Sequence, residues 1–228
     1  MKRIVTTLAL LAVCAAPALA ANSVRISQIY GGGGGTALSN TYTLDYVEIY
    51  NNGNTVQNIG GWAIEYGSAA GFWGSSALNQ FVFPVGTTIQ PCQYLLVAMG
   101  TAGTGGGPLP VPPDFSGTLT MSATAGKVAL FNALNNNIAC GLELAGTLVD
   151  KVSYGTGNCP EVTNVGTLSG AQGGVRNAAG VTDTDNNLLD FTIVANPVPR
   201  NSASPRNASC LVTPTRVSTW GSVKAIYR

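Results

Sequence analysis

The stretch "SVRISQIYGGGGG", residues 23–35, places five consecutive glycines directly after a strand-like segment. Val24 and Ile26 alternate with polar residues, which predicts a strand, and the phase shift at Ile29 indicates a bulge. A phosphate-binding loop leads from a strand into a helix and usually carries a Lys before a Ser or Thr. Here "TALSNTYTLDYVEIYN", residues 36–51, has no Lys and leads into another strand pattern. We therefore interpret the glycines as a strand-to-strand connection and not as a nucleotide site.

Further short strand patterns follow along the chain, with glycine, proline and asparagine between them. They lie at residues 44–51, 61–67, 80–84, 93–100, 127–133, 147–155 and 188–194. The central run "QYLLVAMG" is apolar without interruption, which is typical of a strand covered on both faces. Many short strands without a long helical period predict an all-β fold, an antiparallel β-sandwich. Its core is expected to contain Trp62, Phe81, Phe83 and Phe191.

The beginning of the chain has the pattern of a secretory signal peptide. A basic start, Lys2-Arg3, precedes an apolar run that ends at Leu19, and a small-residue cleavage signal ends at Ala20. Residues 1–20 are therefore expected to be removed, and the mature protein is expected to be secreted, extracellular or at the cell surface. No later segment reaches the ~18 consecutive apolar residues that suggest a membrane-spanning helix.

Charge is sparse, and this excludes several classes of function. Removing 20 residues from 228 leaves 208, and the basic residues fall from 11 to 9 against 10 acidic ones, a net charge of −1. Such a chain has no basic field that would hold nucleic acid by its phosphates. The chain has no histidine, so Ser-His-Asp and Cys-His nucleophilic sites and His-ligated metal centres are excluded. We expect a protein that is not an enzyme and needs no cofactor.

Four cysteines follow the predicted leader, an even number that indicates two disulfides with three possible pairings. We favour Cys140–Cys159, which brackets one strand pattern, and Cys92–Cys210. Zinc is a weak alternative because Cys-x-x-Cys and histidine are both missing. Cys14 raises the alternative of a lipoprotein, but the valine before it is too large for a good lipidation site.

The order of several motifs resembles bacterial lamin tail domains. "VRISQIYGGGGG", "LDYVEIYNNGN" and "IGGWAIEYGSAAG" resemble the start of that family, and "GTTIQPCQYLLV", "SATAGKVALFN", "LVDKVSYGTGNC" and "GGVRNAAGVTDTDNNLLDFTIVANPVPRNS" resemble the remainder. The resemblance covers about residues 22–205. It implies an immunoglobulin-like β-sandwich that binds or attaches, with a protein or cell-surface partner and no catalytic site. Similar domains also occur beside nuclease or phosphatase domains, so an accessory subunit of such an extracellular enzyme is an alternative.

The segment "DTDNNLLD", residues 183–190, concentrates oxygen-bearing side chains. Asp183, Asp185 and Asn187 alternate, with Asp190 nearby, and this spacing is similar to the start of a calcium loop. The alternative is an Asx-rich turn whose side chains cap their own backbone. Both interpretations stay open from the sequence.

An aromatic pair, Phe72 and Trp73, lies in the small-residue segment "GSAAGFWGSSA". If exposed, the pair could contact a protein partner or stack on sugar rings; packing over the end of the sandwich is the alternative. Together with calcium at residues 183–190, a sugar-stacking pair would make the protein a calcium-stabilised carbohydrate-binding module, a further alternative function.

The remaining charged strand residues are expected to be structural. Glu48 is expected to meet Arg25 or another strand neighbour, and Glu65, Asp150 and Lys151 are expected to be ordinary surface or edge residues. Residues 206–228 form a tail outside the strand pattern, interpreted as a docked terminal piece with a short helix or as a sorting or attachment segment.

Overall fold

The computed structural model describes residues 23–208 and residue 210, so the predicted leader and most of the predicted tail lie outside the described residues. The described chain is built mainly from strands. They are β1 (Val24–Tyr30), β2 (Asp45–Asn51), β3 (Gln57–Asn58), β4 (Ala63–Ser68), β5 (Gln80–Val82), β6 (Thr88–Ile89), β7 (Tyr94–Met99), β8 (Phe115–Gly117), β9 (Gly126–Phe131), β10 (Leu148–Tyr154), β11 (Gln172–Arg176) and β12 (Phe191–Ala195). Short helical turns are η1 (Ala77–Asn79), α1 (Asn177–Gly180) and α2 (Asn187–Asp190). Among the described helices, none is long and apolar enough to span a bilayer.

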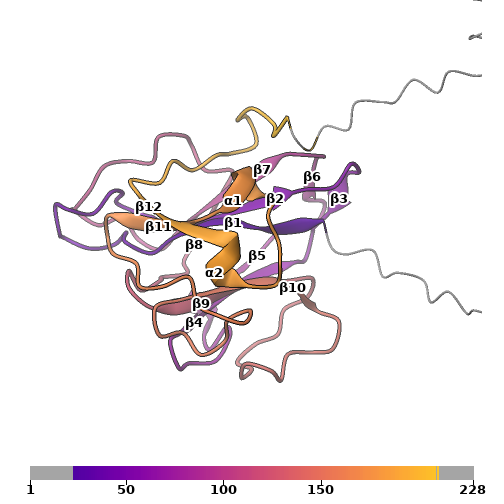
Figure 1. The fold of residues 1–228 in the computed structure, drawn as a ribbon, viewed down its shortest axis with the longest axis horizontal. Helices are drawn as coiled ribbons and strands as arrows, with labels where there is room; N and C mark the ends of the chain where they lie inside the picture. The colour runs from indigo at the N-terminus through magenta and orange to yellow at the C-terminus, as the bar shows by residue number, and fades with distance from the viewer. Residues whose placement is uncertain (1–22, 209, 211–228) are drawn as a thin grey trace, which may run out of the picture.

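The strands form two main sheets, one above the other in Figure 1. The larger sheet has the order β12-β11-β1-β2-β7-β8, the smaller has the order β10-β9-β4-β5, and β3 pairs with β6 alone. Neighbouring strands run antiparallel except β7 and β8, which run parallel. The predicted immunoglobulin-like β-sandwich is confirmed.

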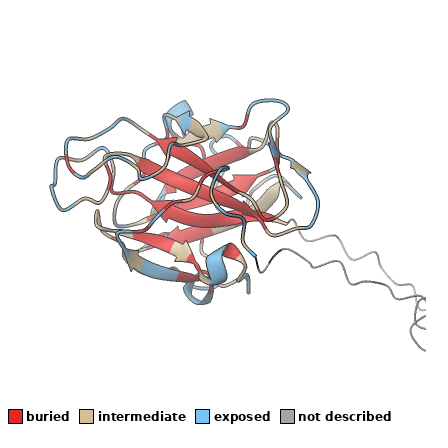
Figure 2. Cartoon of the chain, turned by 90° about the horizontal axis from the view of Figure 1, so that it is seen from above, coloured by how far each residue is buried: buried red, intermediate tan, exposed pale blue. Residues whose placement is uncertain are grey.

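The main core lies between the two sheets, and Figure 2 shows the buried strands surrounded by more exposed loops. Both sheets contribute, through Val24, Ile26, Ile29, Val47, Ile49, Leu95, Val97, Met99, Ile64, Tyr66, Val128, Leu130, Val152 and Tyr154. Of the aromatic residues expected in the core, Phe83 and Phe191 are buried, and Trp62 and Phe81 are partly buried against the same cluster. Burial of these apolar side chains is the main contribution to folding.

The larger sheet is also covered on its outer face. One aromatic cluster there contains Tyr30, Tyr42 and Tyr46, whose rings lie 5.5 to 6.1 Å apart. A second cluster contains Tyr50 and Tyr94, with ring centroids 4.8 Å apart. Every residue of β1, β2 and β7 is buried as a result, as predicted for "QYLLVAMG".

The glycine run connects β1 to the segment before β2, and packs against a second glycine-rich loop. The N–H groups of Thr104 and Gly105 both donate to the carbonyl oxygen of Gly35, at 3.1 and 3.0 Å. A Cβ atom on Gly33 would lie 2.1 Å from the backbone nitrogen of Asp45. The glycines are therefore needed because two backbones approach where no side chain fits.

Two local predictions from the sequence were incomplete or wrong. β11 was missed because its "QGGVR" sequence lacks a strand pattern. Its Gly173 allows close approach to β1, since a Cβ atom at this position would lie 2.8 Å from the Ile29 carbonyl oxygen. Leu188 and Leu189 were predicted to begin a strand but lie in α2. The Asn186 side chain caps that turn by accepting the N–H of Leu188 at 3.2 Å.

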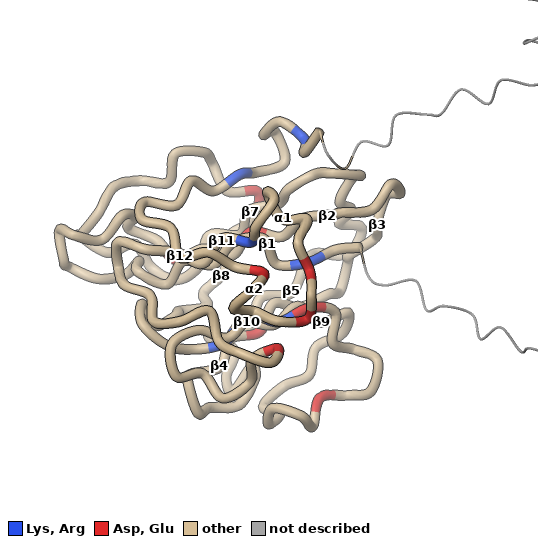
Figure 3. Tube along the Cα trace, in the orientation of Figure 1, with Lys and Arg blue, Asp and Glu red and all other residues tan. Residues whose placement is uncertain are grey.

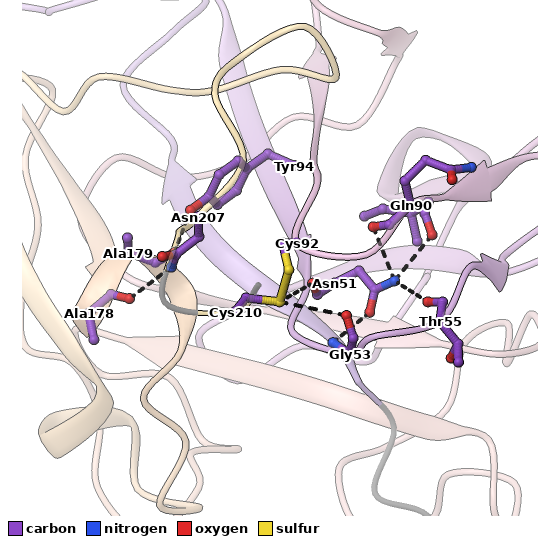
Figure 4. Close-up of a disulfide and its surroundings, with 11 residues drawn as sticks. Asn51, Gly53, Thr55, Gln90, Cys92, Tyr94, Ala178, Ala179, Asn207 and Cys210 are labelled. Atoms are coloured by element: carbon purple, nitrogen blue, oxygen red, sulfur yellow. Dashed lines mark hydrogen bonds between the residues drawn. A yellow bond between two sulfur atoms is a disulfide. The ribbon is translucent and has the colours of Figure 1, made fainter. Parts of the chain in front are cut away.

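Both predicted disulfides are present. Cys140–Cys159 joins residues 19 apart, and Cys92–Cys210 joins residues 118 apart. Figure 4 shows the second bond beside Asn51, whose side-chain nitrogen donates to three carbonyl groups. The bond fixes the segment that follows β12 to the start of β7.

Candidate functional site

A buried ion pair joins the two sheets. Arg176 ends β11 in the larger sheet, and its Nη2 lies 2.7 Å from Oδ2 of Asp150, which belongs to β10 in the smaller sheet. The same two side chains also bond the backbone of Ile26. Arg176 Nε donates to the Ile26 carbonyl oxygen at 2.7 Å, and the Ile26 N–H donates to Oδ2 of Asp150 at 2.6 Å. Ile26 adjoins the bulge in β1, where the register shifts between Ile26 and Gln28. The pair therefore supplies hydrogen-bond partners to Ile26 where the pairing of β1 with β11, which includes Gln28 and Ile29, does not extend.

The "DTDNNLLD" segment lies next to this ion pair, and its side chains make internal contacts. Asp183 Oδ1 lies 3.1 Å from Nη1 of Arg176. The carboxylate of Asp190 accepts the N–H groups of Thr184 and Asn186 from its own turn. Asp185 is exposed, with φ of 56°. This geometry is that of an Asx-rich turn around a guanidinium.

Asn187, the remaining residue of the predicted calcium set, is fully buried and faces β10. Its Oδ1 accepts the N–H groups of Ser153 at 3.0 Å and Glu161 at 3.1 Å. Its Nδ2 donates to the carbonyl oxygen of Lys151 at 3.0 Å and to Glu161 Oε2 at 2.8 Å. The amide thus forms four hydrogen bonds and leaves no oxygen directed at an ion.

Glu161 lies in the same region, and its pKa is also perturbed. Burial raises its pKa to about 8, with the negative charge of Asp150 acting in the same direction and Arg176 opposing it. Oxygens of Asp150, Glu161 and Asp183 lie within 4.8 Å of one another, a spacing that a metal ion could use. However, the Arg176 guanidinium bonds Asp150 and Asp183, so a cation already lies among these carboxylates.

Glu48 forms a second internal network, on the outer face of β2. Its Oε1 lies 2.6 Å from Nη2 of Arg200 and accepts the hydroxyl of Ser27 at 2.5 Å. The predicted contact with a strand neighbour is found, since Ser27 lies on β1. The alternative partner, Arg25, instead lies 3.3 Å from Asp183. Arg200 also stacks over the Tyr94 ring at 3.7 Å, so it fixes the segment after β12 to the sheet.

The prediction that Glu65 and Asp150 are ordinary surface or edge residues is wrong for Glu65 and holds for Asp150 only in its place on an edge strand. Glu65 is fully buried, and its Oε1 accepts the N–H of Asn135, from the loop after β9, at 2.6 Å. Asp150 lies on an edge strand but is buried by the segments that cover it. Lys151 is partly exposed. Alternation of side chains along a strand does not reveal loops that cover its outer face.

The aromatic pair Phe72 and Trp73 divides between surface and core. Trp73 is fully buried, its ring packs on Phe131 at 5.9 Å, and its indole N–H donates to Glu143 at 2.7 Å. For Trp73, the interpretation as an exposed contact residue is wrong and the alternative, packing over the sandwich, holds: a backbone bridge to Ile138 keeps it against the sandwich.

Phe72 keeps 48% of its surface exposed and lies beside this anchored tryptophan. Leu142 and Leu144, on either side of Glu143, are 70% and 52% exposed. The Trp73–Glu143 hydrogen bond and the Cys140–Cys159 bond hold the two loops in place. We call Phe72, Leu142 and Leu144 the apolar loop surface.

Charged side chains point mainly inward, and Figure 3 shows how few lie along the trace. The buried charged residues are Arg25, Asp45, Glu48, Glu65, Lys127, Asp150, Arg176 and Asp190. Within residues 23–208, the exposed charged residues are Asp183, Asp185 and Arg206. Five others are partly exposed: Asp114, Glu143, Lys151, Glu161 and Arg200. The surface of the described chain therefore carries few charges, and its exposed loops present mainly neutral polar and apolar groups.

The sequence model of the Lamin Tail Domain family matches residues 17–156. The chain belongs to the Lamin Tail Domain family. The matched segment runs through β10, and in this Lamin Tail Domain protein β11 and β12 complete the larger sheet.

A solved structure with a similar fold is a DUF4876 family protein from Bacteroides thetaiotaomicron VPI-5482. The TM-score is 0.52 at 13% sequence identity, covering 82% of this chain and 75% of that chain. At this identity the similarity shows the fold alone. A search of curated proteins found no match to this Lamin Tail Domain chain.

Proposed function

We propose that this Lamin Tail Domain protein is an exported, non-catalytic module that binds or attaches to a neutral protein or cell-surface component. The observation that carries the proposal is the small number of exposed charges on the described chain. A surface with few charges offers hydrogen bonds and apolar contact, and little electrostatic steering toward phosphates or acidic polymers.

The apolar loop surface is the part of the chain best suited to such contact. Exposed aromatic side chains are enriched in interfaces, and a rigid backbone beneath them lowers the entropic cost of binding. Phe72 is held by the buried Trp73, and the loop with Leu142 and Leu144 is closed by the Cys140–Cys159 bond. We propose Phe72 as the central anchor of the contact.

The hydrogen bonds of the buried acids support a non-catalytic role. Asp45 accepts the N–H groups of Gly33 and Met121 at 2.7 and 2.8 Å, Glu48 bonds Arg200, and Asp150 bonds Arg176. Acids engaged in this way hold the fold and do not face a substrate. Export is proposed from the leader pattern of residues 1–20, and the two disulfides are consistent with an oxidising compartment.

The test is binding of the fluorescently labelled protein to whole cells of the source organism. We expect saturable binding that is insensitive to salt between about 50 and 500 mM, because surface charge pairs are few. Phe72→Ala is expected to weaken binding roughly tenfold or more, the effect of removing an interface anchor. Leu38→Ala, at an exposed apolar residue on the glycine-rich loop, is the matched control.

Two results would contradict the proposal. One is the absence of saturable binding, or binding that Phe72→Ala and Leu38→Ala reduce equally. The other is turnover of a phosphoester, nucleic acid or glycoside by the purified protein alone, which would indicate an enzyme.

A further inference from the structure

The edge strands of the two sheets differ in how they are protected. In the part of the chain that the structure describes, the edges are β8 and β12 in the larger sheet and β5 and β10 in the smaller. β5 and β8 have three residues each, too short to template a partner strand well. β10 is longer, but other segments cover its edge. The N–H of Val165 donates to the Ser153 carbonyl oxygen at 2.9 Å, and the Asn187 amide bonds the backbone of Ser153 and Lys151. Three of these edges are therefore short or covered.

β12 has none of these protections. Its five residues, Phe191–Ala195, include no charge and no proline, and its pairing with β11 has an unbroken register without a bulge. Among the residues that the structure describes, its only strand partner is β11, so the backbone groups on its other side face away from the sheet. Thr192, Ile193 and Ala195 are exposed. Natural proteins usually block such an edge with lysine, proline or a bulge.

We propose that β12 pairs antiparallel with β12 of a second copy of this chain, about a two-fold axis at Ile193. In this register residue 191 faces 195 of the partner copy, 192 faces 194, and Ile193 faces its own equivalent. In an antiparallel pair a two-fold axis can lie at one residue whether that residue and its equivalent form a hydrogen-bonded or a non-hydrogen-bonded pair. The pairing joins two larger sheets into one continuous sheet.

The residues beyond the strand make this edge self-complementary. Apolar side chains are exposed near both ends of β12, Leu188 and Leu189 before it and Val198 after it, and antiparallel pairing brings each end of one strand beside the opposite end of the other. The two-fold axis repeats this apolar contact on the opposite side. Because β12 carries no charge, no like charges face one another across the pair. This complementarity favours a second copy over an unrelated strand.

The dimer is expected to be weak, because five-residue strands and a few apolar side chains form a small interface. We expect a dissociation constant on the order of 10–100 μM. Sedimentation velocity of the purified chain between about 1 and 500 μM should therefore show a shift from monomer to dimer with rising concentration. A monomer at every concentration would overturn the proposal.

Two variants separate this edge from non-specific association. Ile193→Lys brings two positive charges together at the axis and should leave the chain monomeric throughout the range. Val85→Lys places the same charge on another exposed apolar residue, in the turn before β6, and should dimerise as the unmodified chain does. Equal dimerisation of both variants would place the interface elsewhere. The thermal unfolding midpoint confirms that each variant is folded.

A cysteine at the axis tests the register even if the lysine variant fails to fold. Under mild oxidation Ile193→Cys should form a covalent dimer well above the level of Val85→Cys and of the unmodified chain, because two residues on the axis lie within disulfide distance. Equal yields from the two variants would rule out pairing at Ile193. The inference does not depend on the apolar loop surface, and Phe72→Ala should leave dimerisation unchanged.

Discussion

The side-chain amide of Asn187 pairs with the backbone of β10 around Ser153 as a neighbouring strand would. Its oxygen accepts the Ser153 N–H and its nitrogen donates to the Lys151 carbonyl oxygen, both at 3.0 Å. One side chain from the turn before β12 thereby completes an edge of the other sheet. The turn is a structural connection between the two layers of the sandwich.

Replacing Asn187 is expected to destabilise the protein strongly. Asn187→Ala removes the partners of buried groups on Ser153, Lys151 and Glu161, and each unsatisfied group costs about 1–3 kcal/mol. We expect the free energy of unfolding, measured by urea denaturation, to fall by about 3 kcal/mol or more. Asn54→Ala, at an exposed asparagine, should change it by less than about 0.5 kcal/mol. Similar values for the two variants would show that the amide adds little.

The ion pair between Arg176 and Asp150 leads to a second prediction. Arg176→Met leaves the buried Asp150 without its cation and should lower the free energy of unfolding by about 3–5 kcal/mol. Arg176→Lys should recover only part of this loss, because lysine has one donor group where arginine bonds both Asp150 and the Ile26 carbonyl. Arg206→Met, at an exposed site, is the control. Full recovery by lysine would contradict the geometric role assigned to the guanidinium.

The raised pKa of Glu161 predicts how stability depends on pH. An acid whose pKa rises from 4.5 to about 8 on folding binds its proton more tightly in the folded state. Its contribution to the free energy of unfolding is complete below pH 4.5 and is lost progressively as the pH rises to about 8. Glu161→Gln mimics the protonated acid and should lose less stability between pH 5 and about 9 than the unmodified chain.

The measurement is the difference in unfolding midpoint between the two proteins at each pH. Acids that do not interact with Glu161, such as Asp45, whose pKa burial raises to about 6, are common to both proteins and cancel in the difference. The advantage of Glu161→Gln should increase with pH. A constant difference would mean that Glu161 titrates normally.

The glycine run allows a steric prediction. Gly33→Ala places a Cβ atom 2.1 Å from backbone atoms of the Leu44–Asp45 peptide, which cannot move aside as a flexible side chain could. We expect a loss of about 2 kcal/mol or more in the free energy of unfolding. Gly107→Ala, on the facing loop, meets its nearest atom at 3.8 Å and should cost less than about 1 kcal/mol. Equal losses would mean that conformational entropy, and not contact, explains the glycines.

The two disulfides are expected to differ in their contributions. In the chain-entropy view, opening the loop of 118 residues by replacing Cys92 and Cys210 with serine costs about 5 kcal/mol. Opening the loop of 19 residues at Cys140 and Cys159 costs about 3 kcal/mol. Urea denaturation of both double variants checks the order, and the reverse order would mean that local packing outweighs loop closure.

Much of the fold could be predicted from the sequence because its central strands have regular patterns. The alternation in β1 and β2 and the apolar run of β7 are local properties that a short window contains. The even number of cysteines likewise restricted the disulfides to few pairings. β11 could not be predicted, since its two glycines act through close approach to β1, which only the folded chain shows.

The candidate site was less predictable, because it depends on residues distant in sequence. Asp150 and Arg176 are 26 residues apart, and Glu48 and Arg200 are 152 apart. The "DTDNNLLD" segment was singled out correctly as an unusual cluster, but its chemistry depends on a guanidinium that the spacing of the acids does not reveal. The sequence left exposure and burial of Trp73 open for the same reason: its burial depends on the distant loop around Ile138.

The Cys92–Cys210 bond also decides how tension would pass through this molecule. A pull on any segment beyond Cys210 reaches Cys92 through the sulfur bridge, at the start of a central strand. The residues between the two cysteines, including the outermost strand β12, are bypassed and cannot be peeled away from that end while the bond is intact. After reduction of the bond the same force would pass through β12. The force that an attached protein withstands would therefore depend on the redox state of its surroundings.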